Sequence, residues 1–276
     1  VATAGGVLPP ALRADLLAAA DAGLDLVNGL HHLLADEPEL AALARERGAR
    51  IFDIRRPRPT SELRFWSGQV LSLTTPRIAV LGTDCALGKR TTSTLLVAAC
   101  RKAGLRADMV FTGQTGWLQG WPHGFILDAT PNDFVCGELE RAILECARES
   151  APDLIFLEGQ SALRNPSGPC GSELIVAAGA RGVILQHAPG REHFEDLDTL
   201  GCRIPPVAEE LALIRLLGAE VWALTLNQEG LDRAQAEEAR RRLQAELRLP
   251  VFLPLVDDLS GLVDVIRARV ATVTAA

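Results

Sequence analysis

The sequence predicts an α/β protein whose main domain is a doubly wound, mostly parallel sheet of the P-loop NTPase type. Two observations carry this prediction. From residue 77 onward, short apolar runs alternate with helical patterns, and a glycine-rich phosphate-binding motif follows the first of these runs. The runs are nearly continuous, as in parallel strands that helices cover on both faces. The 276 residues leave room for a smaller companion domain.

Each element of the main domain, residues 77–276, follows from this alternation. The expected strands are 77–81, 107–111, 153–157, 182–186, 220–225 and 250–253. The expected helices are 89–103, 132–149, 171–179, 206–217, 232–247 and 259–270.

Residues 1–54 predict a small Rossmann-like α/β domain. Its expected elements are a strand end with a glycine turn at 1–6, a helix from Pro9 to about Ala22, a strand at 24–27, a helix at 39–47 and a strand at 50–54. The domain is short for a Rossmann half, and we expect it to be truncated at its N-terminal side. Residues 55–76, rich in Pro, Arg and Ser/Thr, predict a linker.

Composition argues against several classes of partner. The net charge is −7, and no Lys/Arg stripe marks a nucleic-acid surface. The densest basic stretch, residues 55–58, is interpreted as a solvated linker. No apolar run reaches the roughly 18 residues of a transmembrane helix, so no membrane partner is expected. The six cysteines show no C-x-x-C pair or metal-ligand spacing, which predicts reduced thiols in a cytoplasmic protein without a metal centre.

The phosphate-binding motif, with spacing G-x-x-x-x-G-K, lies between an expected strand and an expected helix. Its two glycines let the backbone turn so that N–H groups point inward, and the lysine supplies a full charge beside the helix N-terminus. The motif and the residues that follow the lysine predict a cofactor site. An Asn after a later strand is added to this site, because an Asn near that point often contacts the base in nucleotide-binding proteins of related architecture. The expected cofactor-binding residues are Gly82, Thr83, Asp84, Gly88, Lys89, Arg90, Thr91, Thr92 and Asn227.

One position departs from the usual motif. The residue after the lysine is normally Ser or Thr, whose hydroxyl binds Mg²⁺. Here it is Arg90, which cannot ligate a metal but can pair with a phosphate or a carboxylate. The loop therefore indicates phosphates firmly and Mg-ATP only weakly.

Polar residues follow several of the expected strands, at the edge where ligands of such sheets bind. Glu158 ends one strand and is either a catalytic carboxylate or a turn residue, while His187 ends the next and is either a general base or structural. Asp133 begins a helix, where it is equally an N-cap or a base. These three are the candidate catalytic residues. The candidate substrate-binding residues, in glycine-rich turns and at nearby arginines, are Gln114, Thr115, Gly116, Arg164, Asn165 and Arg191.

Two resemblances narrow the function. GTDCALGK, the TG turn and the strand-end EG resemble dethiobiotin synthetase, an ATP-dependent enzyme of the same sheet type. Nearly the whole chain resembles a family of P-loop proteins long described as a domain of unknown function, whose members are D-glutamate N-acetyltransferases that use acetyl-CoA. This second resemblance rests on the stretches AGGVLPP, GLDLVNGLH, GTDCALGKRTT, TGQTGW, NDFVCGELE, EGQSAL with NP one residue later, LQHAPGR and LTLNQEG. In that family a further strand-helix segment precedes AGGVLPP.

Three hypotheses follow. The first, implied by the resemblance, is acetyl transfer from acetyl-CoA to the amine of a D-amino acid, D-glutamate above all. The second is an ATP-dependent ligase or kinase that uses Mg²⁺ and acts on a small carboxylate, and the third is a nucleotide-binding module without turnover. The first accounts best for Arg90, because CoA brings phosphates but needs no Mg²⁺. We expect the protein to form a homo-oligomer and to bind a small amino-acid substrate.

Overall fold

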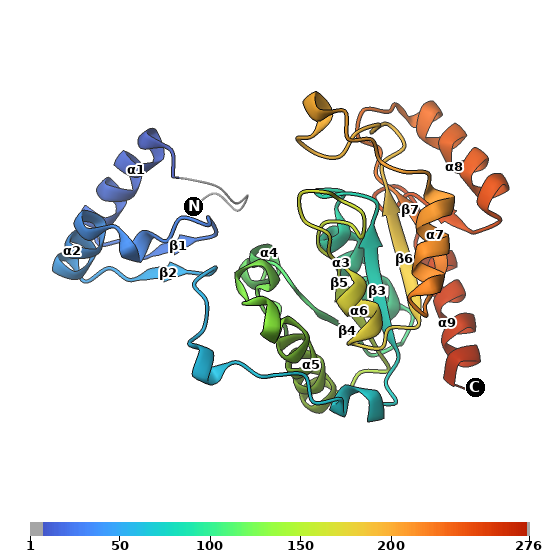
Figure 1. The fold of residues 1–276 in the computed structure, drawn as a ribbon, viewed down its shortest axis with the longest axis horizontal. Coiled ribbons are helices and arrows are strands. Elements are labelled where there is room, and N and C mark those ends of the chain that lie inside the picture. Colours follow the sequence, from blue (N-terminus) through green and yellow to red (C-terminus); the bar gives the residue numbers. More distant parts are fainter. Residues whose placement is uncertain (1–7, 275–276) are drawn as a thin grey trace.

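The computed structural model describes residues 8–274, and its main domain is built on a six-stranded sheet (Figure 1). The strand order is β4-β5-β3-β6-β7-β8, and every neighbouring pair is parallel. The predicted fold class is therefore confirmed. The strands are β3 (Arg77–Gly82), β4 (Ala107–Val110), β5 (Leu154–Glu158), β6 (Gly182–His187), β7 (Glu220–Leu226) and β8 (Val251–Phe252).

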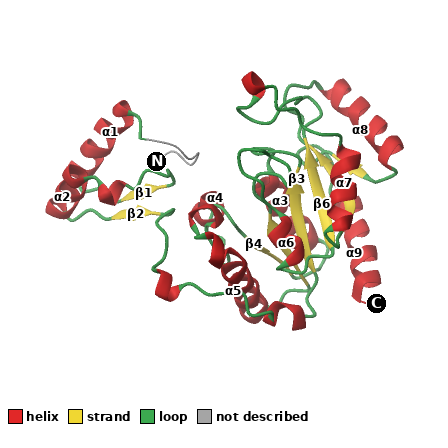
Figure 2. Ribbon diagram, viewed as in Figure 1, coloured by secondary structure: helices red, strands yellow, loops and turns green. Residues whose placement is uncertain are grey.

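Helices cover both faces of this sheet (Figure 2). One buried apolar cluster contains residues of α5, α6, α7 and α8, and the other contains residues of α3 and α9. These two sets of helices therefore pack against opposite faces of the sheet. The helices are α3 (Lys89–Lys102), α4 (Gln114–Leu118), α5 (Asn132–Ser150), α6 (Ser172–Val176), α7 (Val207–Leu216), α8 (Arg233–Leu247) and α9 (Ser260–Thr274).

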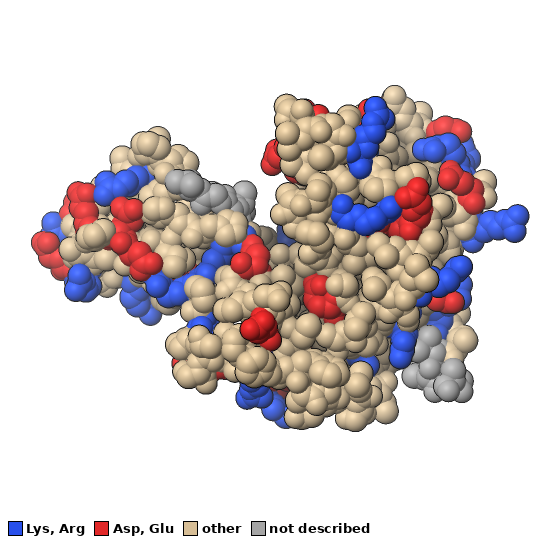
Figure 3. All heavy atoms as spheres, in the orientation of Figure 1, with Lys and Arg blue, Asp and Glu red and all other residues tan. Residues whose placement is uncertain are grey.

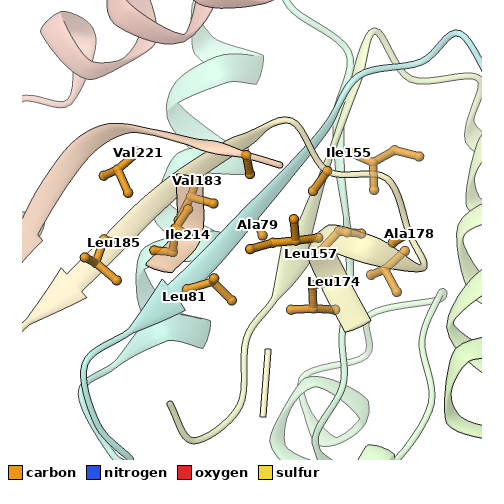
Figure 4. Close-up of a cluster of buried hydrophobic side chains, with 14 of the residues drawn as sticks. Ala79, Leu81, Ile155, Leu157, Leu174, Ala178, Val183, Leu185, Ile214 and Val221 are labelled. Carbon is orange, nitrogen blue, oxygen red and sulfur yellow. The ribbon is translucent and has the colours of Figure 1, made fainter. Parts of the chain in front are cut away.

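Strand β3 shows why the sequence reads as a continuous apolar run. Successive side chains of a strand point to opposite faces. Ile78 and Val80 therefore enter the cluster under α3 and α9, while Ala79 and Leu81 enter the cluster under the other helices (Figure 4). All four are at most 2% exposed, so neither face of the strand tolerates a polar residue.

Two predicted elements are shorter than expected, and one turn is a helix. The helix predicted at 171–179 is limited to Ser172–Val176, since Gly171 and Gly179 adopt left-handed φ angles of 119° and 67°. The strand predicted at 250–253 keeps only Val251–Phe252 at the edge of the sheet. The stretch after β4, expected as a glycine turn, forms α4.

The N-terminal unit has a core of its own. Its strands β1 (Leu26–Asn28) and β2 (Ile51–Asp53) pair in parallel, beside helices α1 (Pro10–Asp21) and α2 (Pro38–Arg47). Leu16, Leu34 and Leu40 are buried between them. The strand end expected at residues 1–6 lies outside the described residues.

The segment between the two units is mostly exposed, but hydrogen bonds tie it to α5 at several points. The carboxylate of Glu138 accepts a hydrogen bond from the backbone N–H of Arg64, and that of Glu140 accepts from Ser67 and Val70. The interpretation of residues 55–58 as solvated is wrong for Arg55, which is 7% exposed and pairs with Asp128. Short 3₁₀ helices are Leu34–Asp36, Thr60–Glu62, Gln69–Ser72, Leu127–Ala129 and Asp198–Leu200.

The surface carries both signs of charge. On the face drawn in Figure 3, Lys and Arg side chains are interspersed with Asp and Glu over both units. Among the described residues, no helix combines the length and the apolar character needed to cross a bilayer.

Candidate functional site

The phosphate-binding motif forms the turn between β3 and α3, at the carboxyl edge of the sheet. Strand β3 lies between β5 and β6, so the strand order reverses beside it. The turn after β3 therefore lies at the topological switch point of the sheet, where ligands of such folds usually bind. Gly88 precedes α3 with a φ of 91°, a conformation that glycine adopts without strain. Ala86 also has a positive φ, of 51°, which an alanine adopts only at a steric cost.

A cavity of about 340 Å³ opens on one side of this turn. Its walls come from the motif, from the start of α4 and from the segment that follows β5. This volume lies within the range of small-molecule sites. The lining residues are Cys85, Ala86, Leu87, Gly88, Lys89, Arg90, Gly113, Gln114, Thr115, Glu158, Gly159, Gln160 and Ser161.

Lys89 brings a buried cation to this cavity. Its Nζ donates to the backbone oxygens of Asp84, at 2.6 Å, and Ser161, at 2.8 Å. Gly82 leaves space for this side chain, since a Cβ there would lie 3.0 Å from the Lys89 Cδ. Burial lowers the pKa of Lys89 to about 8, so the ammonium form still dominates at neutral pH.

Glu158 brings a buried carboxylate to the same cavity. The residue is 6% exposed, and its Oε2 accepts from the backbone N–H of Thr112 at 3.0 Å. Burial raises the pKa of Glu158 to about 7, against the opposing effects of the Thr112 N–H, Arg90 and Lys89. A carboxyl group with this pKa takes up and releases protons near neutral pH, as a general acid or base must.

On the other side of the turn, Asp84 is fully buried in a network of donors. Its Oδ1 accepts from the N–H of Cys85 and from the Asn165 side chain, and its Oδ2 accepts from Arg191 and from the N–H of Glu195. The four distances lie between 2.7 and 3.0 Å. Asp84, Asn165 and Arg191, all predicted to touch ligands, therefore hold the loop in place from outside the cavity.

Threonines of the motif and of α3 anchor the turn to β6. The Thr83 Oγ1 lies 2.9 Å from the His187 Nδ1, and the Thr92 Oγ1 donates to the Gln186 Oε1 at 2.7 Å. Burial lowers the pKa of His187 to about 4, so this histidine is neutral at pH 7. His187 does not line the cavity.

Asn227 lies beside a second, smaller hollow of about 90 Å³. Gly88, Thr91 and Thr92 also line this hollow, and the Asn227 side chain donates to the Leu87 carbonyl at 3.1 Å. Leu87 and Gly88 border both hollows, so the motif runs between them.

Three further predicted residues lie away from the cavity. Asp133 is exposed at the start of α5. Arg164 forms ion pairs of 2.7 Å with both Glu209 and Glu210 of α7. Gly116 packs against Phe111, where an added Cβ would lie 2.3 Å from the Phe111 Cβ. Of the predicted residues, those that line the cavity are Gly88, Lys89, Arg90, Gln114, Thr115 and Glu158.

Two polar residues of the segment after β5 line the cavity and were not among the predicted site residues. Gln160 donates its side-chain amide to the Thr112 carbonyl and lines the cavity. The backbone carbonyl of Ser161 accepts a hydrogen bond from Lys89, and its hydroxyl oxygen lies 3.3 Å from the sulfur of Cys85. Ser161 also has a positive φ, of 42°. Both come directly after the EG that ends β5, so their position along the chain was the available signal.

Comparisons with known proteins match both units of the chain to family models. Residues 64–263 match the family described as a domain of unknown function, DUF1611_C, P-loop domain, and residues 1–57 match the DUF1611_N Rossmann-like domain. A D-glutamate N-acetyltransferase of Tritonibacter scottomollicae is 30% identical, with 97% of this chain and 80% of the relative covered. One of Pseudoalteromonas sp. is 28% identical, with 95% and 78% covered.

A solved structure extends the likeness to three dimensions. The crystal structure of a DUF1611 family protein from Anabaena variabilis superimposes with a TM-score of 0.87 at 31% identity. The match covers 97% of this chain and 78% of that chain.

Proposed function

Because the chain belongs to the DUF1611 family of P-loop proteins with a Rossmann-like N-terminal domain, we propose that it transfers an acetyl group from acetyl-CoA to the amine of a D-amino acid, foremost D-glutamate. The names of the relatives supply the acceptor and the reaction class. One observation in this chain supports the chemistry: Glu158, with its pKa near 7, lines the same cavity as the phosphate loop.

The loop fits a phosphate-bearing donor that needs no metal. Lys89, Arg90 and the turn between Cys85 and Gly88 line the cavity, and they offer cationic groups and backbone N–H groups to the phosphates of CoA. Acetyl-CoA supplies the activated acetyl thioester when bound. Arg90 occupies the place of the usual Mg²⁺ ligand, which a CoA phosphate does not require. The Asn227 hollow, on the other side of Gly88, is where we expect the adenine part.

Glu158 is the residue that we propose as the base. An ammonium group must lose a proton before its nitrogen attacks a thioester, and a carboxylate with a pKa near 7 accepts that proton efficiently at pH 7–8. Asp133 is exposed outside the cavity, and the buried neutral His187 faces Thr83, so neither matches Glu158 in position. Gln114 and Thr115 of α4 lie across the cavity and offer polar contacts to the acceptor.

Thiol release from acetyl-CoA tests the proposal. The purified chain is incubated with acetyl-CoA and a panel of D- and L-amino acids, without ATP and without added Mg²⁺, and the acetylated product is identified by mass spectrometry. We expect turnover with D-glutamate and little with L-glutamate. Turnover that appears only with ATP and Mg²⁺ contradicts the proposal in favour of an ATP-dependent ligase or kinase.

A further inference from the structure

A second group of chemically reactive side chains lies on the edge of the sheet, outside the cavity. Asp108 belongs to β4, His123 to the loop before Phe125, and Cys146 to the last turns of α5. Their potential ligand atoms all lie within 4.8 Å of one another, and the residues are 5%, 4% and 0% exposed. The three residues are far apart in sequence, so no spacing motif announces them.

The surroundings leave the charge of Asp108 poorly compensated. Its Oδ1 accepts from the backbone N–H of Met109 at 2.8 Å, but the nearest cation, Arg101, is 3.8 Å away and its side chain is 55% exposed. Glu149, whose Oε2 lies 3.9 Å from the His123 Nδ1, is 54% exposed and pairs with Arg148, so it leaves the charge of Asp108 as it is. A buried carboxylate without a close cation is costly, and a metal ion is one of the groups that offset this cost.

The donor set matches a particular class of ion. A thiolate, an imidazole and a carboxylate together are ligands of Zn²⁺, and a Cys thiolate disfavours Mg²⁺ and Ca²⁺. With the thiol and the carboxyl group ionised and the imidazole neutral, the three ligands balance the charge of a divalent cation. The Ser150 hydroxyl lies 3.1 Å from the His123 Nε2, where a partner orients a metal-binding imidazole and leaves the Nδ1 for the ion.

We propose that Asp108, His123 and Cys146 form a structural binding site for one zinc ion. The ion would link β4, α5 and the loop that contains His123. A hydrogen bond of 3.0 Å from the Phe111 N–H to the His123 carbonyl also holds this loop in place. The chain between Phe111 and His123 carries α4, and α4 provides Gln114 and Thr115 to the wall of the cavity. The site therefore stabilises a wall of the cavity without taking part in the reaction.

Cobalt titration tests this site without reference to activity. The purified chain is stripped with a chelator, freed of the chelator and titrated with Co²⁺, and absorption spectra are recorded. We expect one equivalent to bind with a thiolate-to-cobalt charge-transfer band, which one equivalent of Zn²⁺ then removes. Zn²⁺ should also raise the melting temperature, since a ligand that binds only the folded state stabilises it.

Two cysteines make a matched pair of variants. Cys146→Ser should abolish the charge-transfer band, whereas Cys100→Ser, at a fully buried thiol of α3 outside the cluster, should keep it. Asp108→Asn retains the thiol and should weaken Zn²⁺ binding at least about tenfold. A wild-type chain that binds Co²⁺ without the thiolate band, or that binds none, overturns the proposal even if Cys146→Ser does not fold.

Discussion

The two sides of the phosphate loop hold their buried carboxylates in opposite ways. Asp84, in the loop itself, is fully buried and accepts four hydrogen bonds, two of them from Arg191 and Glu195 of the segment that follows β6. On the β5 side, Glu158 accepts from the Thr112 N–H, lies beside the cavity and has its pKa raised to about 7 by burial. A fully bonded carboxylate fixes a loop, whereas one left with little compensation is available to exchange protons. Asp84 and its partners therefore hold the loop in shape, whereas Glu158 is the carboxylate that can take part in proton transfer.

The largest effect should come from Asp84→Asn, on stability. Asn keeps one acceptor but loses the charge that faces Arg191 and presents an amide to donors. We expect a loss of about 2–3 kcal/mol in the free energy of unfolding, the scale of hydrogen bonds to a buried charged group. The melting temperature should fall by several degrees, measured by calorimetry. Asp133→Asn, at an exposed acid, is the control and should leave it unchanged.

Glu158→Gln should show the reverse pattern, with a large effect on rate and none of this loss of stability. Gln keeps the acceptor for the Thr112 N–H but cannot take a proton. We expect kcat to fall at least about 100-fold, the scale of a lost general base, or about 2.7 kcal/mol in the barrier. In the wild type kcat should rise as pH increases through about 7, and the variant should lose this rise. Normal turnover by the variant would remove Glu158 from the chemistry.

The same substitution sharpens the comparison through stability. The folded-state pKa of Glu158 is raised above its unfolded value of 4.5, so its contribution to stability is present below pH 4.5 and is lost as pH rises through about 7. Glu158→Gln escapes this loss. We therefore expect it to melt at a higher temperature than the wild type at pH 8 and to show no such advantage at pH 4.5. A lower melting temperature at pH 8 would mean that the carboxylate stabilises the fold.

Lys89→Ala should have a smaller effect, on binding. The substitution removes the charge from the loop while Gly88 and the backbone remain. We expect the affinity for CoA to fall at least about tenfold, or 1.4 kcal/mol, by isothermal titration calorimetry. Lys102→Ala, at an exposed lysine on the last turn of the same helix, is the matched control. Equal affinities for both variants would place the phosphates elsewhere.

The difference between the two sides of the loop was only partly predictable. Apolar runs specify the strands because both faces of the sheet are covered, and the position of Glu158 directly after one such run was sufficient to place it at the ligand edge. Local sequence could not show that Asp84 and Arg191 pair with each other, because their contact depends on how distant loops pack. The same limit applies to Arg164, which looks like a free cation in sequence and is neutralised by Glu209 and Glu210 of α7.

The smallest effect on turnover should come from His187, which lies on the structural side of the loop. Its Nδ1 faces the Thr83 Oγ1, and burial lowers its pKa to about 4, so it is neutral wherever Glu158 acts as a base. We expect His187→Gln to change kcat less than about threefold at pH 8, which is below the scale of general-base loss.

The larger effect of His187→Gln should be on stability in acid. The unfolded pKa is 6.5, so the wild-type histidine destabilises the fold progressively as pH falls from 6.5 through about 4. The variant should lose less stability than the wild type over that interval, measured by urea unfolding at pH 7 and pH 4.5. A large fall in kcat with an unchanged acid profile would move the base to His187 and reverse the roles of the two sides.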